Sequence, residues 1–283
     1  MRASSGRCGR RRRTRRRPPS SPPAGASRTF PYAKEGTRFP PGALRRTEDR
    51  RSTADRSAEG RGGTARRPTV RGMKIAILGT GTVGRHLARG WLRAGHDVVL
   101  GSRRPREARS RTGDLPLTDL AAAVADAPVV VNATPGTASV ELLASVGADA
   151  LAGKVLLDVA VGFTADGSLS HPGESLGEEI QRTFPATRVV KTLCTVDRKL
   201  MIAPDSVQGP STLFLSGEDA EAKRTVSGLL RDLGWPADCL LDLGGIATAR
   251  GQEHYSLLFI GIAQALGSYG FGIRVVEETA RPA

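Results

Sequence analysis

The chain has 283 residues and a formal net charge of +14, and this length allows one sizeable α/β domain or two small ones. The excess positive charge lies entirely in residues 1–72, which carry 21 Lys and Arg against 5 Asp and Glu; residues 73–283 carry 21 against 23. This distribution excludes a nucleic-acid-binding role for the folded part on grounds of charge, because such a role needs an excess of cations.

Residues 1–72 are rich in Arg, Pro, Ser and Gly and show no apolar periodicity. Such a segment cannot bury enough apolar surface to offset its ordering entropy, so the sequence predicts a disordered tail. No apolar run follows the arginines, which excludes a secretory signal. A transit peptide, a nucleic-acid-binding arm and a segment without a role all stay open, and we expect the working protein to begin at Met73.

The cysteines and histidines are scattered along the chain and show no metal-ligand spacing. The sequence therefore predicts a reduced, cytoplasmic protein without a metal site or structural disulfides. One uncharged run, residues 255–273, contains Gln264 and four glycines. This composition favours a buried or subunit-interface helix over a membrane span, and no membrane partner is expected.

From residue 73, short apolar runs alternate with segments of helical periodicity, and residues 102–113 are a polar stretch. Strands are expected at residues 73–79, 96–101, 128–135, 154–162, 188–196, 211–217 and 239–245. Helices are expected at residues 83–95, 117–127, 139–151, 175–185, 219–234 and from 247 onward, before a short final element "FGIRVV".

Strands separated by helical segments of this length imply βαβ crossovers and a mostly parallel sheet. The predicted fold class is α/β, a doubly wound Rossmann fold with a small C-terminal element of helix and strand. We expect a nucleotide-binding domain at residues 73–198 and a smaller substrate or dimerisation region at residues 199–283.

The sequence "GTGTVG" follows the first strand and opens the first helix. Gly79 permits the tight turn, Gly81 lets the backbone approach a pyrophosphate, and Gly84 lets the helix pack closely on the strand. The amides of the intervening residues face an anion at the positive end of the helix dipole. In this context the motif predicts dinucleotide binding by Gly79, Thr80, Gly81, Thr82, Val83 and Gly84.

The second strand ends in "GSRRP", where many dinucleotide-binding proteins carry a carboxylate that accepts from the ribose 2′-hydroxyl of NAD. Ser102 and Arg103 instead suit a 2′-phosphate, since a guanidinium pairs with phosphate through charge-assisted hydrogen bonds. Two such bonds favour NADP over NAD by a factor on the order of 10². We interpret Arg104 and Arg106 as solvated charges.

Two further loops follow the third and fourth expected strands, at residues 132–139 and 157–163. Open parallel sheets bind ligands at the carboxyl ends of their strands, so these loops are expected to face the nicotinamide half of the cofactor. The alternative is a pair of ordinary turns. The predicted cofactor contacts in the two loops are Thr134, Pro135, Gly136, Ala160 and Phe163.

The segments "MKIAILGTGTVGR", "GHDVVLGSRRP", "VVVNATPG", "RVVKTLCT" and "LFLSGEDAEAK" together resemble the NADPH-dependent deazaflavin (coenzyme F420) reductase family. That family shares its nucleotide domain with pyrroline-5-carboxylate reductases. The resemblance implies hydride transfer between NADP(H) and coenzyme F420 as second substrate, positioned by the protein without a catalytic side chain. It also implies a homodimer formed with the C-terminal unit.

By the same resemblance, the loop after the fifth strand lines the second-substrate cleft through Cys194, Thr195, Val196 and Arg198. Many relatives carry Asn-Pro at Val161-Gly162, and Asn at Cys194 and Asp197, so this chain departs from the family on the substrate side. Two alternatives therefore stay open. One is a small-molecule imine reductase related to the pyrroline-carboxylate enzymes, and the other is a non-catalytic NADP-binding redox sensor.

Overall fold

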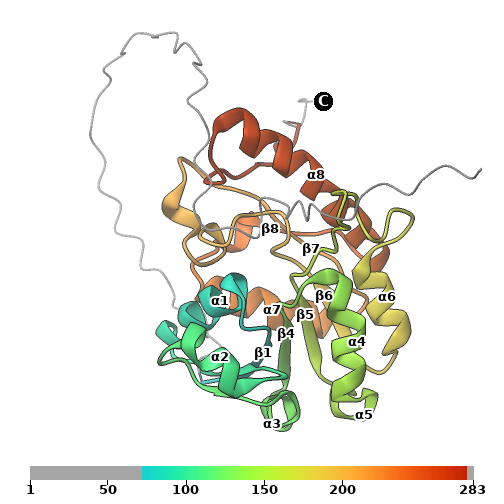
Figure 1. Ribbon diagram of the computed structural model, residues 1–283. Helices are drawn as coiled ribbons and strands as arrows, with labels where there is room; N and C mark the ends of the chain where they lie inside the picture. The colour runs from blue at the N-terminus through green and yellow to red at the C-terminus, as the bar shows by residue number, and fades with distance from the viewer. Residues whose placement is uncertain (1–71, 279–283) are drawn as a thin grey trace, which may run out of the picture.

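The computed structural model describes residues 72–278. Its main sheet has six parallel strands in the order β3-β2-β1-β4-β5-β6, which confirms the doubly wound Rossmann fold (Figure 1). The predicted tail at residues 1–72 lies outside the described part, except for Gly72. The strands are β1 (Lys74–Leu78), β2 (Asp97–Gly101), β3 (Leu117–Thr118), β4 (Val129–Asn132), β5 (Val155–Asp158) and β6 (Arg188–Lys191).

Helices cover both faces of this sheet. Four short 3₁₀ turns, η2 (Leu200–Ile202), η3 (Pro204–Ser206), η4 (Ala237–Cys239) and η5 (Ile246–Thr248), lie in the C-terminal third. The α-helices within residues 72–278 are α1 (Thr82–Arg93), α2 (Pro105–Thr112), α3 (Leu120–Val124), α4 (Gly136–Val146), α5 (Ala148–Leu151), α6 (Leu176–Thr183), α7 (Ala220–Asp232) and α8 (Ala249–Leu266).

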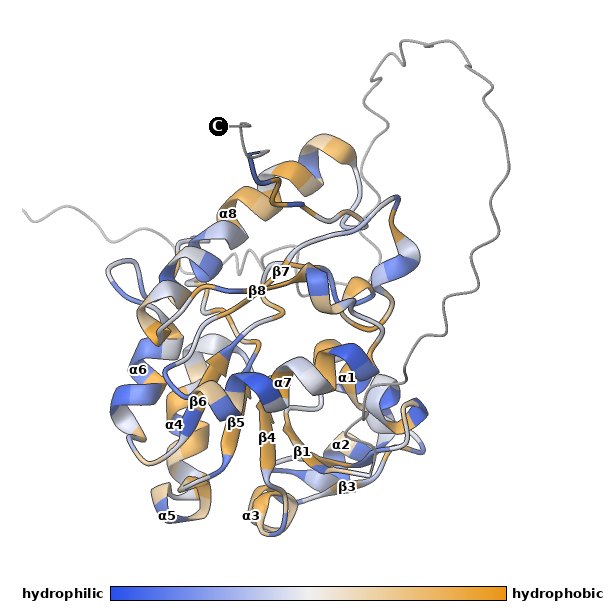
Figure 2. Ribbon diagram, turned by 180° about the vertical axis from the view of Figure 1, so that it is seen from behind, coloured by the Kyte–Doolittle hydropathy of each residue, from blue (hydrophilic) through white to orange (hydrophobic). Residues whose placement is uncertain are grey.

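The hydrophobic core has two layers, one on each face of the main sheet, and the orange strands at the centre of Figure 2 separate them. On one face, α1 and α7 pack together through residues such as Leu87, Trp91 and Leu229. The Trp91 indole also donates to the Leu229 carbonyl at 3.0 Å. On the other face, α4 and α6 contribute Leu143 and Ile180. Strands buried on both faces explain the continuous apolar runs in the sequence.

Several local expectations are corrected by the structure. The polar stretch at residues 102–113 contains α2, which begins with Pro105 at its first position and is exposed on most of its surface, so its sequence carries little apolar periodicity. The helix expected at residues 139–151 is split at Gly147, whose φ of 101° ends α4.

The last two predicted strands do not join the main sheet. They are β7 (Leu213–Leu215) and β8 (Leu240–Asp242), which pair in parallel with each other. A single antiparallel bridge, Lys191 to Ser216, connects β6 with the end of β7. The final "FGIRVV" stretch forms no strand and is tied to the fold by the Thr212 amide, which donates to the Ile273 carbonyl at 2.7 Å.

The long C-terminal helix α8 lies at one end of the molecule, beyond β7 and β8 (Figure 1). It buries Gln252, Glu253 and Phe259 on one face and leaves Leu257 and Leu258 exposed on the other. Among the described residues, no helix combines the length and apolar character that a membrane crossing requires. The same part of the chain brings no three potential metal ligands together.

Candidate functional site

The strand registers place the ends of five strands side by side. Leu78 of β1 pairs with Gly101 of β2 and with Asn132 of β4, Asn132 pairs with Asp158 of β5, and Asp158 pairs with Lys191 of β6. The loops that follow these residues therefore emerge at one edge of the sheet. This edge contains the predicted glycine loop, Ser102 and Arg103, and both βα loops.

The three motif glycines meet different constraints. A Cβ on Gly79, which has a φ of 122°, would collide with the carbonyl oxygen of Ala133, and a Cβ on Gly84 would collide with the carbonyl oxygen of Gly79. A Cβ on Gly81 would meet nothing within 4 Å. The backbone itself therefore requires Gly79 and Gly84, whereas the space above Gly81 is open for a ligand to approach.

The N-terminus of α1 is available to an anion. Gly81 is its N-cap, no side chain caps the helix, and its first turn contains no acidic residue. The nearby Arg85 guanidinium donates to the Thr80 carbonyl at 2.8 Å, which adds positive charge and fixes the loop. Uncapped amides at a positive helix end suit a phosphate group, so the residues present fit a dinucleotide.

Ser102 and Arg103 extend from the same edge next to this loop. The Gly79 amide donates to the Gly101 carbonyl at 3.3 Å, which ties the two segments together. Arg103 is exposed and makes no hydrogen bond or ion pair to any residue in the described range. Arg104 instead pairs with Glu107 at 3.3 Å. Of the two adjacent arginines, Arg103 is the one whose guanidinium is free to meet a phosphate.

The two βα loops lie against each other. A Cβ on Gly136 would collide with the backbone of Val161 and Gly162, so glycine is required for this approach. The first loop is held from below by Asn132, whose side-chain oxygen accepts from the Thr134 hydroxyl at 2.6 Å. Pro135 is exposed, Thr134 and Ala160 are buried, and Phe163 forms an antiparallel bridge with Leu169.

A buried ionic cluster, Asp158, Lys191 and Glu253, lies directly beneath the second loop. The Lys191 ammonium contacts the Asp158 carboxylate at 2.9 Å and the Glu253 carboxylate at 2.7 Å, and it also donates to the Ala160 carbonyl. The Ala160 amide donates to Asp158 at 3.2 Å. Both polar groups of the Ala160 backbone are thus fixed by the cluster.

The pKa values in this cluster reflect burial and charge together. Burial raises the pKa of Asp158 above its ordinary value, although Lys191 opposes the shift. Burial by itself lowers the pKa of Lys191, but the charges of Asp158 and Glu253 outweigh it, so that the pKa lies above its ordinary value. The two neighbouring carboxylates therefore favour the ammonium form of Lys191.

A second polar chain supports the same loop from outside. The Ser170 hydroxyl contacts His171 Nδ1 at 2.8 Å, and His171 Nε2 contacts the Glu179 carboxylate at 2.5 Å. A Cβ on Gly162 would collide with the Ser170 hydroxyl. Gly162, one of the two residues that depart from the family's Asn-Pro, thus leaves room for a serine that the sequence alone did not single out.

The predicted cleft loop after β6 is well buried. Thr195 and Val196 are each 2% exposed, and Val196 packs in the hydrophobic core. Leu193 has a φ of 64°, a left-handed conformation that costs a bulky residue about 1–2 kcal/mol. Burial raises the pKa of the Cys194 thiol to about 12. This thiol is therefore protonated and unsuited to act as a nucleophile.

The cleft loop meets α8 through Gln252. The Gln252 side chain contacts Cys194 Sγ at 3.8 Å and donates to the Lys191 carbonyl at 3.3 Å. Two hydroxyl groups of this region, on Thr195 and Ser256, are buried without a hydrogen-bond partner among the described residues. Ser256 lies one turn beyond Gln252, on the side of α8 that contacts this loop.

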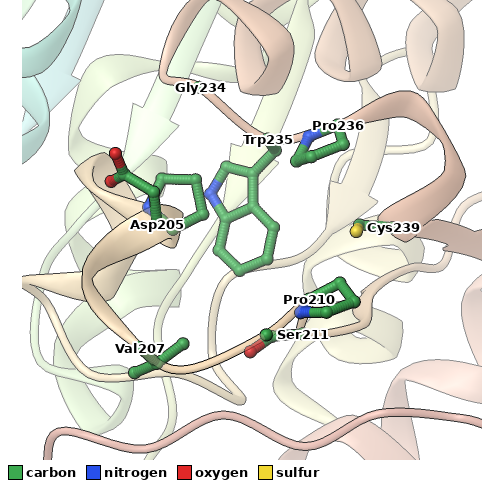
Figure 3. A pocket seen from close by; sticks show the side chains of 10 residues that line it. Asp205, Val207, Pro210, Ser211, Gly234, Trp235, Pro236 and Cys239 are labelled. Atoms are coloured by element: carbon green, nitrogen blue, oxygen red, sulfur yellow. The ribbon is translucent and has the colours of Figure 1, made fainter. Parts of the chain in front are cut away.

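A pocket of about 300 Å³ lies apart from all the predicted site residues, between residues 204–211 and 234–239. In Figure 3 the Trp235 ring occupies the middle of this group, with the Cys239 sulfur to its side. The Trp235 indole donates to the Met201 carbonyl at 3.0 Å, which anchors it as part of the wall.

Sequence reasoning missed the polar groups that support the loops. Three buried strands end in a polar residue, namely Asn132, Asp158 and Lys191. Because polar residues are uncommon at buried positions, such residues at strand ends indicate a structural or functional role that the sequence could have shown. Glu253 could not be found in this way, because only the fold brings α8 against β6. Ser170 and His171 follow an irregular segment and carry no sequence pattern.

Comparisons with known proteins agree with this geometry. The family model described as NADP oxidoreductase, coenzyme F420-dependent, matches residues 74–162. A protein from Arthrobacter sp. FB24, provisionally described as an F420-dependent NADP-reductase, has a solved structure that is 41% identical in sequence. The match covers 73% of this chain and 100% of that one, with a TM-score of 0.68.

Other similar proteins share less sequence identity with this chain or match a smaller part of it. The metalloreductase STEAP3 of Rattus norvegicus is 32% identical over 180 residues, a match that covers 64% of this chain and only 36% of that protein. A reductive aminase from Aspergillus terreus, solved with NADPH and ethyl-5-oxohexanoate, is 22% identical with a TM-score of 0.51 over 69% of this chain and 63% of that one. That likeness shows the fold alone.

Proposed function

Because this chain belongs to the family of coenzyme F420-dependent NADP oxidoreductases, we propose that it transfers a hydride between NADPH and a deazaflavin of the coenzyme F420 type. One observation carries the cofactor half of this proposal. The open space above Gly81, at an uncapped helix N-terminus, lies at the same sheet edge as Arg103, which is exposed and has no partner among the described residues. The deazaflavin half is supported by the relative that this chain covers in full.

Different residues of the site bind different parts of the nucleotide. The amides of Thr82 and Val83 at the start of α1 bind the pyrophosphate, and Ser102 and Arg103 bind the 2′-phosphate. Gly136 allows the two βα loops to close against each other, and Ala160 and Phe163 then border the nicotinamide. Bound NADPH supplies the hydride, and these residues hold its donor ring in one orientation.

The deazaflavin is placed against that ring by the loop from Cys194 to Arg198 and by α8. The unpartnered hydroxyls of Thr195 and Ser256 supply hydrogen bonds for a polar acceptor ring. With both molecules bound, the site would hold the two rings so that the hydride passes from NADPH to the deazaflavin, with one proton taken from solvent. Orientation and exclusion of water account for the rate, because hydride transfer between two positioned rings needs no nucleophile.

Anaerobic mixing of the protein with NADPH and oxidised deazaflavin tests this function. We expect the absorbance of the oxidised deazaflavin to disappear as NADPH is consumed in equal amount. Tight NADPH binding without any change in deazaflavin absorbance would contradict the proposal and favour a redox sensor. Reduction of cyclic imines in place of the deazaflavin would favour an imine reductase.

A further inference from the structure

The ionic cluster beneath Ala160 carries a net negative charge. The two oxygens of Asp158 accept from Asn132, from the Ala160 amide and from Lys191. Those of Glu253 accept from Lys191 and from the backbone amides at the start of α6. Every contact to the two carboxylates comes from a donor, and the formal charges of two carboxylates and one ammonium sum to −1.

Lys191 uses its full hydrogen-bonding capacity within the cluster. Its three protons match three acceptors, the carboxylates of Asp158 and Glu253 and the carbonyl of Ala160. The side chains of Asp158 and Lys191 are 0% exposed, and that of Glu253 is 3% exposed. Solvent therefore screens this charge weakly, and its field extends to groups at the adjoining sheet edge.

The cluster is in direct contact with the loop assigned to the nicotinamide half. Both the amide and the carbonyl of Ala160 bond to it, and Asn132, which contacts Asp158 at 2.8 Å, holds the neighbouring loop. Packing alone does not require such a cluster, because buried ion pairs contribute little net stability relative to apolar residues of similar volume. An electrostatic role at the sheet edge is consistent with the cost of burying three charges there.

We propose that the Asp158–Lys191–Glu253 cluster sets the relative affinity of the site for the two cofactor forms, favouring NADP⁺ over NADPH. This inference rests on the NADP(H) site of the proposed function. Loss of the hydride gives the nicotinamide ring a positive charge, and a buried negative charge nearby stabilises the charged ring over the neutral one. The three residues thus act as positioning and charge-setting groups that favour release of the hydride from NADPH.

The test compares dissociation constants, and no turnover is needed. Titrations with NADP⁺ and with NADPH give the ratio of the two constants, Kd(NADP⁺) over Kd(NADPH), for the full chain. Glu253→Gln removes one negative charge and keeps one oxygen for Lys191 and the Gly177 amide, while the acceptor for the Leu176 amide is lost. We expect this ratio to rise by roughly tenfold in the variant, because a poorly screened negative charge stabilises the charged ring more than the neutral one.

Two variants control for effects of structure. Glu253→Asp keeps the charge, so the ratio should stay at the wild-type value even if both dissociation constants change. Glu221→Gln removes an exposed carboxylate that pairs with Arg224 on α7, where solvent screens it, and should leave the ratio unchanged. Thermal unfolding confirms that each variant is folded. If Glu253→Gln does not fold, Asp158→Asn makes the same test.

An equal rise in both dissociation constants of Glu253→Gln, with their ratio unchanged, would overturn the inference and leave the cluster a purely structural role. So would a ratio that changes as much in Glu253→Asp as in Glu253→Gln. Failure of the wild-type chain to bind either nucleotide would be a different result, because it would contradict the proposed function itself.

Discussion

Glycines around the nucleotide loop are required for two different reasons: some because neighbouring backbone leaves no space for a side chain, and one because a ligand must come close to it. Gly79, Gly84 and Gly136 lack side chains because neighbouring backbone occupies the space that a Cβ would take. Gly81 lacks one although the space is empty, and its φ of −69° is open to any residue. A glycine that the fold does not need, at a helix N-terminus, points to a ligand that comes close to the backbone.

Gly81→Ala separates folding from binding. We expect the melting temperature to stay within about 2 °C of the wild type, because the new methyl group meets no protein atom. NADPH affinity should fall at least tenfold, because the methyl group would occupy the approach of the pyrophosphate. Calorimetric titration and thermal unfolding measure the two effects. Gly251→Ala, on an exposed helix position with equally open space, is the matched control.

We propose that Arg103 is the residue on which the choice between NADP and NAD depends. Arg103→Glu should weaken NADPH binding on the order of 10²-fold, because it replaces a charge-assisted bond with repulsion of the 2′-phosphate. NADH, which lacks that phosphate, should be bound with little change. Parallel fluorescence titrations with both nucleotides measure this. Equal losses for the two would contradict the phosphate assignment, and Arg106→Glu should leave both affinities nearly unchanged.

Among the helices, strands and loops, those whose signals lie within a short stretch of the sequence could be predicted. The β1-loop-α1 unit, the following strand and the position of Arg103 depend on glycine spacing and apolar periodicity within a few dozen residues. Helix α3 begins directly after Asp119, whose carboxylate accepts from the Ala122 amide at 2.9 Å, a capping signal that is local in sequence.

The remaining elements depend on contacts between distant segments. β7 and β8 have the composition of buried strands, but nothing in their sequence states which sheet they join. Lys191 and Glu253 meet only because α8 packs against the end of β6 and the start of α6. The substrate side of the site is therefore less predictable than the cofactor side, whose residues lie in a continuous motif.

The contact between α6 and α8 leads to a prediction about how the free energy of unfolding depends on pH. The hydrogen bond from Arg250 lowers the pKa of Glu178 below its ordinary value near 4.5, so the pair stabilises the folded state above that pH. Arg250→Ala should therefore reduce the free energy of unfolding at pH 7, and the difference from wild type should shrink as pH falls below about 4.5. Urea unfolding from pH 7 to pH 3 measures it. A difference that stays constant would assign the effect to packing of the arginine stem.

For the whole molecule, the exposed face of α8 supports the proposal of a homodimer. Leu257, Leu258 and Leu266 are 46%, 59% and 52% exposed, and Val276 beyond the helix is 80% exposed. Large apolar side chains exposed on one element are a common feature of protein–protein contact surfaces. A second copy of this chain is the proposed occupant, because the same face on both copies gives a self-complementary contact.

Leu258→Glu should shift the protein from dimer to monomer, because it would bury two charges in that contact. Analytical ultracentrifugation over a range of concentrations measures the change. Arg89→Glu, an exposed position on α1, should leave the dimer intact. A wild-type chain that sediments as a monomer at all concentrations would contradict the dimer without affecting the cofactor site.

The proposed function requires that a hydride moves directly between two rings held by this fold. The most direct measurement uses NADPH carrying deuterium at one or the other position of its reactive carbon, in a single anaerobic turnover with oxidised deazaflavin. We predict that one of the two labelled forms, and only one, delivers its deuterium to the reduced deazaflavin, as seen by mass spectrometry. Reduced deazaflavin that contains no deuterium from either form, with the label found in water, would contradict the account.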